Sequence, residues 1–132
     1  MPSVVDTHAW VWWVTNDRRL SSRARTTIER AAKRGDLYLS IYSVWEIAKK
    51  VEIGQLALDR SLDEWLDTAL AVDGLQVAEL TRLILVDSCR LPQPFHGDPA
   101  DQIIVGTARS LSASLVTKDA RLLDYPHVKT IW

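Results

Sequence analysis

The sequence has 132 residues, a length that fits one domain with a substantial core. Its formal net charge of -1 does not indicate a strong nucleic-acid binder. No apolar run approaches the ~20 residues needed to span a membrane, so we expect no membrane association. Cys89 is the single cysteine, which excludes an intrachain disulfide and agrees with a cytoplasmic location. We expect Cys89 to pack as a small apolar residue.

Short β-like runs alternate with helical segments from one end of the chain to the other. In chain order, we predict a strand at Ser3–Asp6, helices at Ala9–Val14 and Ser21–Arg34, a strand at Leu37–Ile41, helices at Val44–Ile53 and Leu62–Val72, a strand at Leu75–Ala78, helices at Thr81–Cys89 and Pro99–Leu111, a strand at Ser114–Thr117, a helical turn near Ala120–Leu123 and a strand at Val128–Trp132. This alternation predicts a single α/β domain over residues 1–132, with helices on both faces of a mostly parallel sheet of about five strands.

Four carboxylates stand at the edges of apolar segments: Asp6, Glu46, Asp101 and Asp119. An isolated carboxylate in apolar surroundings needs a partner, and a divalent cation is one. Each of the four also has an ordinary interpretation as a helix cap or an ion-pair partner. All four together are harder to explain in that way.

The predicted topology gives these acids a common location. Asp6 and Asp119 fall at or just after strand ends, and Glu46 and Asp101 lie near the starts of helices. Sites in open α/β sheets form outside the carboxyl ends of the strands. We therefore expect the four acids to gather at one edge of the sheet, as oxygen ligands suited to Mg²⁺ or Mn²⁺.

Basic residues are concentrated in one stretch. Seven of the sixteen lysines and arginines lie between Arg18 and Arg34, where Glu29 is the only glutamate. The stretch is either a surface that contacts RNA phosphates or a solvated helix face, and the sequence does not decide between them.

Four motifs follow one another in a fixed order: Asp6-Thr7-His8; Ser43-Val44-Trp45-Glu46-Ile47; Asp98-Pro99-Ala100-Asp101 running on to Ala108; and Thr117-Lys118-Asp119. Their order and spacing resemble those of a PIN domain, specifically the VapC-type toxin of toxin–antitoxin pairs. The resemblance covers essentially the whole chain. Gly106 departs from the pattern, in which alanine is usual, and a glycine there weakens a helix by up to about 1 kcal/mol.

The resemblance implies a metal-dependent endoribonuclease that uses Mg²⁺ or Mn²⁺. The residues that match the catalytic acids of the family are Asp6, Glu46, Asp101 and Asp119, with Asp6, Asp101 and Asp119 as the expected metal ligands. Glu46 is expected to bind the metal or to act as a base. Accessory candidates are Asp98, Thr117, Thr7 and His8, and candidate substrate contacts are Arg18, Arg19, Arg23 and His96.

The resemblance also implies partners. They are an RNA substrate, a VapB-like antitoxin whose C-terminal segment lies in a groove lined by the first helix, and a second copy of the chain in a homodimer. Trp10, Trp12 and Trp13 lie on that first helix and cannot all face one way, so we expect one to be partly exposed. Trp45 and Trp65 are expected in the core.

Other functions remain open from the residues alone. One is a PIN-like nuclease that processes RNA or acts on DNA without a toxin role. Another is a non-catalytic PIN-like module that binds RNA or a protein partner. A metal-dependent phosphatase is a third, weaker alternative.

Overall fold

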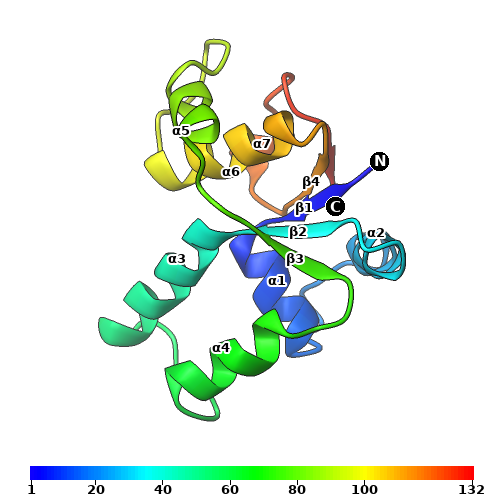
Figure 1. Ribbon diagram of the computed structural model, residues 1–132, viewed down its shortest axis with the longest axis vertical. Helices are drawn as coiled ribbons and strands as arrows, with labels where there is room; N and C mark the ends of the chain where they lie inside the picture. Colours follow the sequence, from blue (N-terminus) through cyan, green and yellow to red (C-terminus); the bar gives the residue numbers. More distant parts are fainter.

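The computed structural model describes residues 1–132 and contains one five-stranded sheet with helices on both faces (Figure 1). The strands are β1 (Ser3–Val5), β2 (Leu37–Ser40), β3 (Leu75–Ala78), β4 (Ser114–Val116) and β5 (Thr130–Ile131). The helices are α1 (Thr7–Val14), α2 (Ser22–Lys33), α3 (Ile41–Glu52), α4 (Leu62–Leu70), α5 (Arg82–Cys89), α6 (Pro99–Ser110) and α7 (Ala120–Leu123). The strand order is β3-β2-β1-β4-β5 and every neighbouring pair is parallel, which confirms the predicted α/β class.

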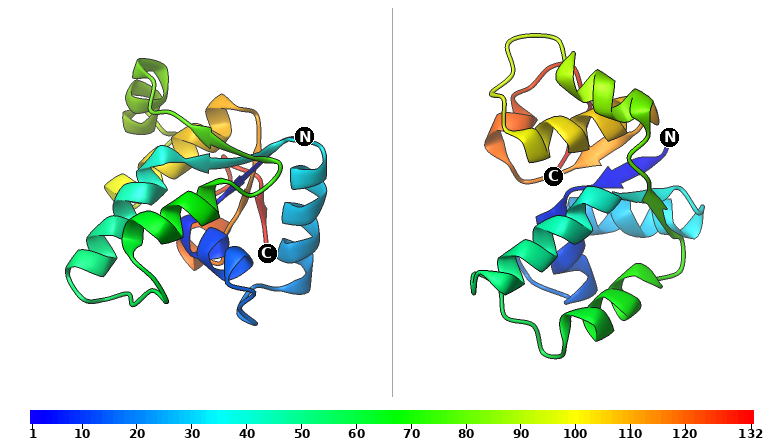
Figure 2. Two further views of the ribbon diagram at one scale, coloured as in Figure 1. Left: turned by 60° about the horizontal axis from the view of Figure 1, so that its bottom comes forward. Right: turned by 60° about the vertical axis from the view of Figure 1, so that its left-hand side comes forward.

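Successive strand residues point to opposite faces of the sheet and supply two separate cores. Val5 and Val116 belong to the core shared with α1, α2, α3 and α4. Their neighbours Val4 and Leu115 belong to the core shared with α6 and α7. Because both faces are covered, the inner strands are apolar at successive positions instead of alternating with polar residues. The two views in Figure 2 show these helical layers on either side of the sheet.

Aspartates begin three of the helices. The carboxylates of Asp6, Asp98 and Asp119 accept hydrogen bonds from backbone N–H groups in the first turns of α1, α6 and α7. The cap at Asp6 explains why α1 begins at Thr7, two residues before the predicted start. None of the seven helices is long and apolar enough to cross a membrane.

Gly106 has a packing reason that the sequence did not reveal. A Cβ atom at this position would lie 2.7 Å from Ser88 Oγ and 3.2 Å from Ser88 Cα. Helices α5 and α6 therefore approach closely because Gly106 has no side chain. The cost in helix propensity is offset by this contact.

Two predictions about burial are wrong. Trp45 is 56% exposed, because the inward face of α3 is formed by Ser43 and Ile47, and its ring stacks on Tyr42 instead. Cys89 is exposed at the end of α5, whose buried face is formed by Ile84 and Ser88. Trp65 is buried as predicted.

Of the three tryptophans on α1, one is fully buried and two are partly exposed, where we expected one to be partly exposed. Trp10 is fully buried, its ring contacts that of Trp65 and its Nε1–H donates to the carbonyl of Ala69. Trp12 and Trp13 are partly exposed.

Candidate active site

The candidate site begins between β1 and β4, where the strand order reverses direction along the sheet. Asp6 follows β1 directly and Thr117 follows β4 directly, and the two strands pair with Val5 opposite Val116. The hydroxyl of Thr117 donates to Oδ2 of Asp6 at 2.7 Å. Such a reversal leaves a crevice at the carboxyl ends of the strands, which is where α/β proteins place their ligands.

A chain of hydroxyl groups ties Glu46 to the same place. Thr7 Oγ1 donates to Glu46 Oε1 at 2.6 Å. Ser43 Oγ lies 2.8 Å from Thr7 Oγ1, and it is the donor of that pair because the Thr7 hydrogen is already directed at Glu46. Ser43 and Thr7 are buried, so their two hydroxyl groups fix the orientation of the Glu46 carboxylate.

Asp101 and Asp119 complete the group from the other side. His96 Nε2 contacts Asp101 Oδ2 at 2.7 Å, and Arg121 Nη2 contacts the same oxygen at 3.3 Å. The same Arg121 nitrogen lies 3.7 Å from Asp119 Oδ2. One cationic nitrogen thus stands near carboxylate oxygens from two different elements. We call Asp6, Glu46, Asp101 and Asp119 the acidic rim.

The electrostatics show that the acidic rim is one coupled site. Burial, and then the negative charges of Asp6 and Asp101, raise the pKa of Glu46, although the hydrogen bond from Thr7 and the charge of Lys50 oppose this. Burial, and then the charges of Asp6, Asp98 and Asp119, raise the pKa of Asp101, although the hydrogen bond from His96 opposes this. Mutual repulsion of this kind favours a bound cation.

His8 lies beside the acidic rim and is held as a neutral ring. Its Nε2 accepts a hydrogen bond from the backbone N–H of Lys118 at 2.9 Å, which leaves the proton on Nδ1, 3.7 Å from Asp6 Oδ2. Burial lowers the pKa of His8, and the charges of Asp6 and Asp119 partly oppose this. The ring also contacts those of Trp12 and Trp132, so His8 links α1 to the end of the chain after β5 as well as to Lys118 after β4.

The other candidates are distributed as follows. Asp98 caps α6 through Oδ1, and its negative charge contributes to the raised pKa of Asp101. Arg19 lies over the Trp12 ring at 4.7 Å and pairs with Asp17. Arg18 and Arg23 are exposed and form no ion pair with the acidic rim.

The far end of the basic stretch lies away from the acids. Arg34, at its end, donates to the carbonyl of Met1 and therefore lies at the amino edge of the sheet, opposite the acids.

The side chains of the acidic rim have the right chemistry for a divalent metal, but they are not preassembled around one point. No three His, Cys, Asp or Glu side chains are arranged to hold a metal ion as they stand. Their oxygens are instead engaged by Thr7, Thr117, His96 and Arg121. The set fits Mg²⁺ or Mn²⁺ by ligand type and by mutual repulsion, and ligation requires that the Arg121 guanidinium and the carboxylates of Asp101 and Asp119 separate.

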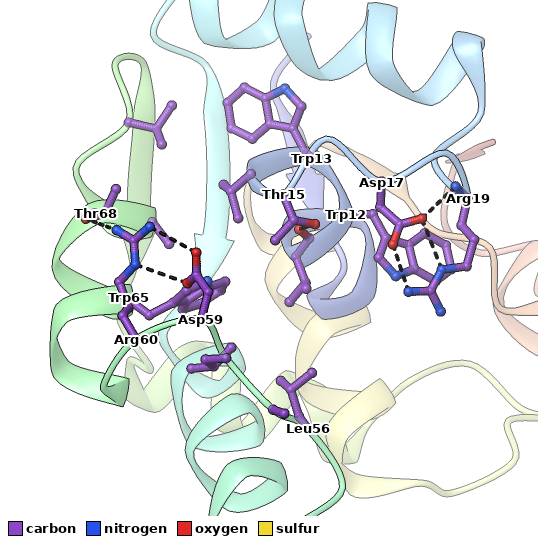
Figure 3. Close-up of a pocket in the computed structure, with 16 residues that line it drawn as sticks. Trp12, Trp13, Thr15, Asp17, Arg19, Leu56, Asp59, Arg60, Trp65 and Thr68 are labelled. Atoms are coloured by element: carbon purple, nitrogen blue, oxygen red, sulfur yellow. Dashed lines mark hydrogen bonds and ion pairs between the residues drawn. The ribbon is translucent and has the colours of Figure 1, made fainter.

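A groove of about 790 Å³ lies between α1, α4 and the segment that joins α3 to α4. Ten of its sixteen lining residues are hydrophobic, among them Trp12, Trp13 and Trp65. Figure 3 shows two aspartate–arginine pairs on its opposite sides, Asp17 with Arg19 and Asp59 with Arg60. The groove is therefore apolar along its floor and charged at its flanks.

Sequence reasoning missed two residues of the site, Ser43 and Arg121. Ser43 precedes Glu46 by three residues, so helical spacing places both on one face of α3. Arg121 follows Asp119 by two residues in a helix too short for periodicity to orient it. Only the folded structure shows that its side chain reaches back to Asp101.

Comparison with known proteins gives consistent results. The family model described as "PIN domain" matches residues 3–128. The chain is 31% identical over 131 residues to Ribonuclease VapC22 of Mycobacterium tuberculosis, covering 98% of this chain and 97% of that protein. A toxin–antitoxin complex from Klebsiella pneumoniae contains a similar fold, with a TM-score of 0.66, 17% identity and coverage of 98% of this chain and 96% of that one.

The VapBC2 complex of Rickettsia felis, bound to a DNA fragment from its promoter, is similar to a comparable degree. Its TM-score is 0.69 at 15% identity, with coverage of 99% of this chain and 98% of that one. At these identities the two solved structures support the fold alone.

Proposed function

Because the chain belongs to the PIN-domain family, of the VapC type, we propose that it is a metal-dependent endoribonuclease and the toxin of a toxin–antitoxin pair. The observation that carries this proposal is the convergence of four carboxylates from α3, α6 and the ends of β1 and β4. We propose one nuclease domain over residues 1–132, since the acidic rim draws on elements from both halves of the chain.

Asp6, Asp101 and Asp119 are the proposed metal ligands. Mg²⁺ or Mn²⁺ bound there would lower the pKa of a bound water and neutralise charge on the scissile phosphate. The chain's own part is to hold these carboxylates in place. Thr117 fixes Asp6 from one side and the backbone N–H of Thr7 fixes it from the other.

Glu46 is the proposed proton acceptor for the attacking water. Its raised pKa brings it closer to the pH at which a general base works well. The hydroxyl of Thr7 engages only one of its oxygens, Oε1. The other oxygen is free of intramolecular hydrogen bonds and is the one we assign to the water.

RNA contacts are proposed for His96 and Arg19. His96 touches Asp101, so it stands where a phosphate bound at the acidic rim would pass. Arg19 and Lys118 flank the Trp12 ring, and cations beside an aromatic ring suit an unstacked base and its phosphate. Arg18 and Arg23 stay weaker candidates because no contact brings them to the acids.

The groove shown in Figure 3 is the proposed site for the antitoxin. Its apolar floor suits an amphipathic helix or an extended apolar segment, and the charged flanks would fix the orientation of that segment. One of the solved structures named above is described as a toxin–antitoxin complex and the other as VapBC2, and the kind of partner proposed for this chain is taken from them. A Trp13→Asp variant is expected to lose binding of the antitoxin while keeping nuclease activity.

A homodimer is also proposed. Leu83, Leu85 and Val86 on α5 are 62%, 43% and 37% exposed, and no other part of the chain covers them. Sedimentation of the wild type and of a Leu83→Asp variant tests self-association through this face. A monomeric wild type contradicts it.

The test of the function is cleavage of RNA by the purified chain in Mg²⁺, in Mn²⁺ and in EDTA. Asp101→Asn removes one charge of the acidic rim, and Asp63→Asn is its matched control, an exposed acid in the first turn of α4. We expect metal-dependent cleavage that Asp101→Asn abolishes and Asp63→Asn leaves unchanged. Folded wild-type protein that neither binds metal nor cleaves RNA would overturn the proposal in favour of a binding module.

A further inference from the structure

Arg121 is the one basic side chain that enters the acidic rim by an ion pair with two of its acids. It is the second residue of α7, beside α6 in Figure 1, and its backbone N–H donates to Asp119 Oδ1 at 2.8 Å. Its guanidinium nitrogen lies 3.3 Å from Asp101 Oδ2 and 3.7 Å from Asp119 Oδ2. The side chain is 56% exposed, so it is reachable from solvent.

Two features indicate that a metal cation can replace the Arg121 guanidinium at Asp101 and Asp119. The Arg121 side chain is half-exposed although the two carboxylates are less so, and water can therefore solvate the guanidinium when another cation displaces it. The backbone bond to Asp119 does not involve the guanidinium, so the helix start keeps Arg121 at the acidic rim after its side chain swings away.

The other lysines and arginines near the acidic rim form no ion pair with its acids. Arg19 is bonded to Asp17 through two nitrogens, and Lys118 is directed to the Trp12 ring. Lys50 acts on Glu46 through its charge but forms no ion pair with any of the four acids. Arg121 alone is both bonded to the acids and free to leave them.

We propose that Arg121 is a phosphate-contacting residue that holds Asp101 and Asp119 until a divalent cation takes them, and then binds a phosphate of the RNA. The inference rests on the proposed function and adds a residue to it. A guanidinium presents a planar fork of donors that fits two phosphate oxygens, which suits it to a substrate that arrives beside the metal ligands.

The proposal predicts opposite changes in metal affinity and RNA affinity when Arg121 is replaced, which a purely structural role does not predict. Removing a positive charge that lies next to two metal ligands strengthens the binding of a divalent cation. Removing the same group weakens the binding of RNA. A residue that only supported the shape of the site would change both affinities in the same direction.

The experiment measures the two affinities separately. Mn²⁺ binding is followed by titration calorimetry, and binding of a labelled single-stranded RNA by fluorescence anisotropy in Ca²⁺, with the RNA checked for integrity afterwards. The variants are Arg121→Ala, Arg121→Lys, Asp101→Asn and Arg30→Ala, the last an exposed arginine on α2. Thermal melting confirms that each is folded.

We expect Arg121→Ala to bind Mn²⁺ about threefold more tightly or better and RNA about fivefold more weakly, on the scale of exposed charge pairs. Arg121→Lys keeps the charge but loses the fork, so its Mn²⁺ affinity stays near that of the wild type while RNA binding is intermediate. Arg30→Ala changes neither affinity.

Unchanged or jointly weakened affinities in Arg121→Ala would overturn this inference. If Asp101→Asn still abolishes Mn²⁺ binding in that case, the proposed metal site stands without it. If the wild type binds no Mn²⁺, or binds it independently of Asp101, both the inference and the proposed function fail.

Discussion

The acidic rim and the apolar layers beside it are formed by the same elements but affect stability in opposite ways. Residues such as Ile28 and Leu39 are fully buried and stabilise the fold by removing apolar surface from water. At the acidic rim, burial and mutual repulsion raise the pKa of Glu46 and of Asp101, so their negative charges oppose folding. The negative charges of Glu46 and Asp101 therefore do not stabilise the fold, which agrees with their proposed role in the site.

The largest expected effect separates the two regions through activity. Asp6→Asn keeps a side chain that can cap α1 and accept from Thr117, so the fold is retained. It removes a proposed metal ligand, and we expect cleavage to fall by about 10³-fold, equivalent to about 4 kcal/mol of barrier. Single-turnover cleavage of RNA, together with a melting curve, checks this. Cleavage within tenfold of the wild type would remove Asp6 from the site.

In the core we expect the opposite result, a loss of stability without a loss of cleavage activity. Ile28 is fully buried on α2, and Ile28→Ala leaves a cavity that costs about 3 kcal/mol of unfolding free energy. Cleavage per folded molecule is expected to stay unchanged. Urea unfolding gives the first quantity and activity normalised to the folded fraction gives the second. A large loss of cleavage in folded protein would show that the two regions are not separable.

A smaller effect is expected where the helices meet. Gly106→Ala places a Cβ against Ser88, and we expect a loss of about 1–2 kcal/mol despite the better helix propensity of alanine. Adding Ser88→Ala removes the closest clashing atom, so the double variant recovers most of this loss. A double-mutant cycle of urea unfolding measures the coupling. An additive result would mean that α5 and α6 do not meet as described.

The smallest effect concerns pH. Between the ordinary carboxylate pKa and the raised pKa of Glu46, the native protein binds more protons than the unfolded chain. The unfolding free energy in EDTA therefore rises as the pH falls through this window. Glu46→Gln is uncharged throughout, so its melting temperature is expected to exceed that of the wild type at neutral pH, and the difference to shrink on acidification. Melting curves at several pH values test the sign.

Much of this organisation follows from local chemistry that the sequence displays. The strand and helix positions were predicted because apolar runs and helix caps such as Asp98-Pro99 are local signals. The shared location of the acids was predicted because parallel strands put their carboxyl ends at one edge.

What the sequence did not predict depends on packing between distant segments. The close approach of Gly106 to Ser88 and the reach of Arg121 to Asp101 join residues from different helices. Trp45 was wrongly placed in the core because an apolar neighbourhood in sequence does not fix which face of α3 turns inward.

Anomalous diffraction from crystals of the protein soaked in Mn²⁺ shows directly whether the acidic rim binds a metal ion. We expect a peak at the carboxyl ends of β1 and β4, within coordination distance of carboxylate oxygens of Asp6 and Asp101, with the Arg121 side chain turned away. Well-ordered carboxylates without such a peak, or a peak only at a distant site, would contradict it.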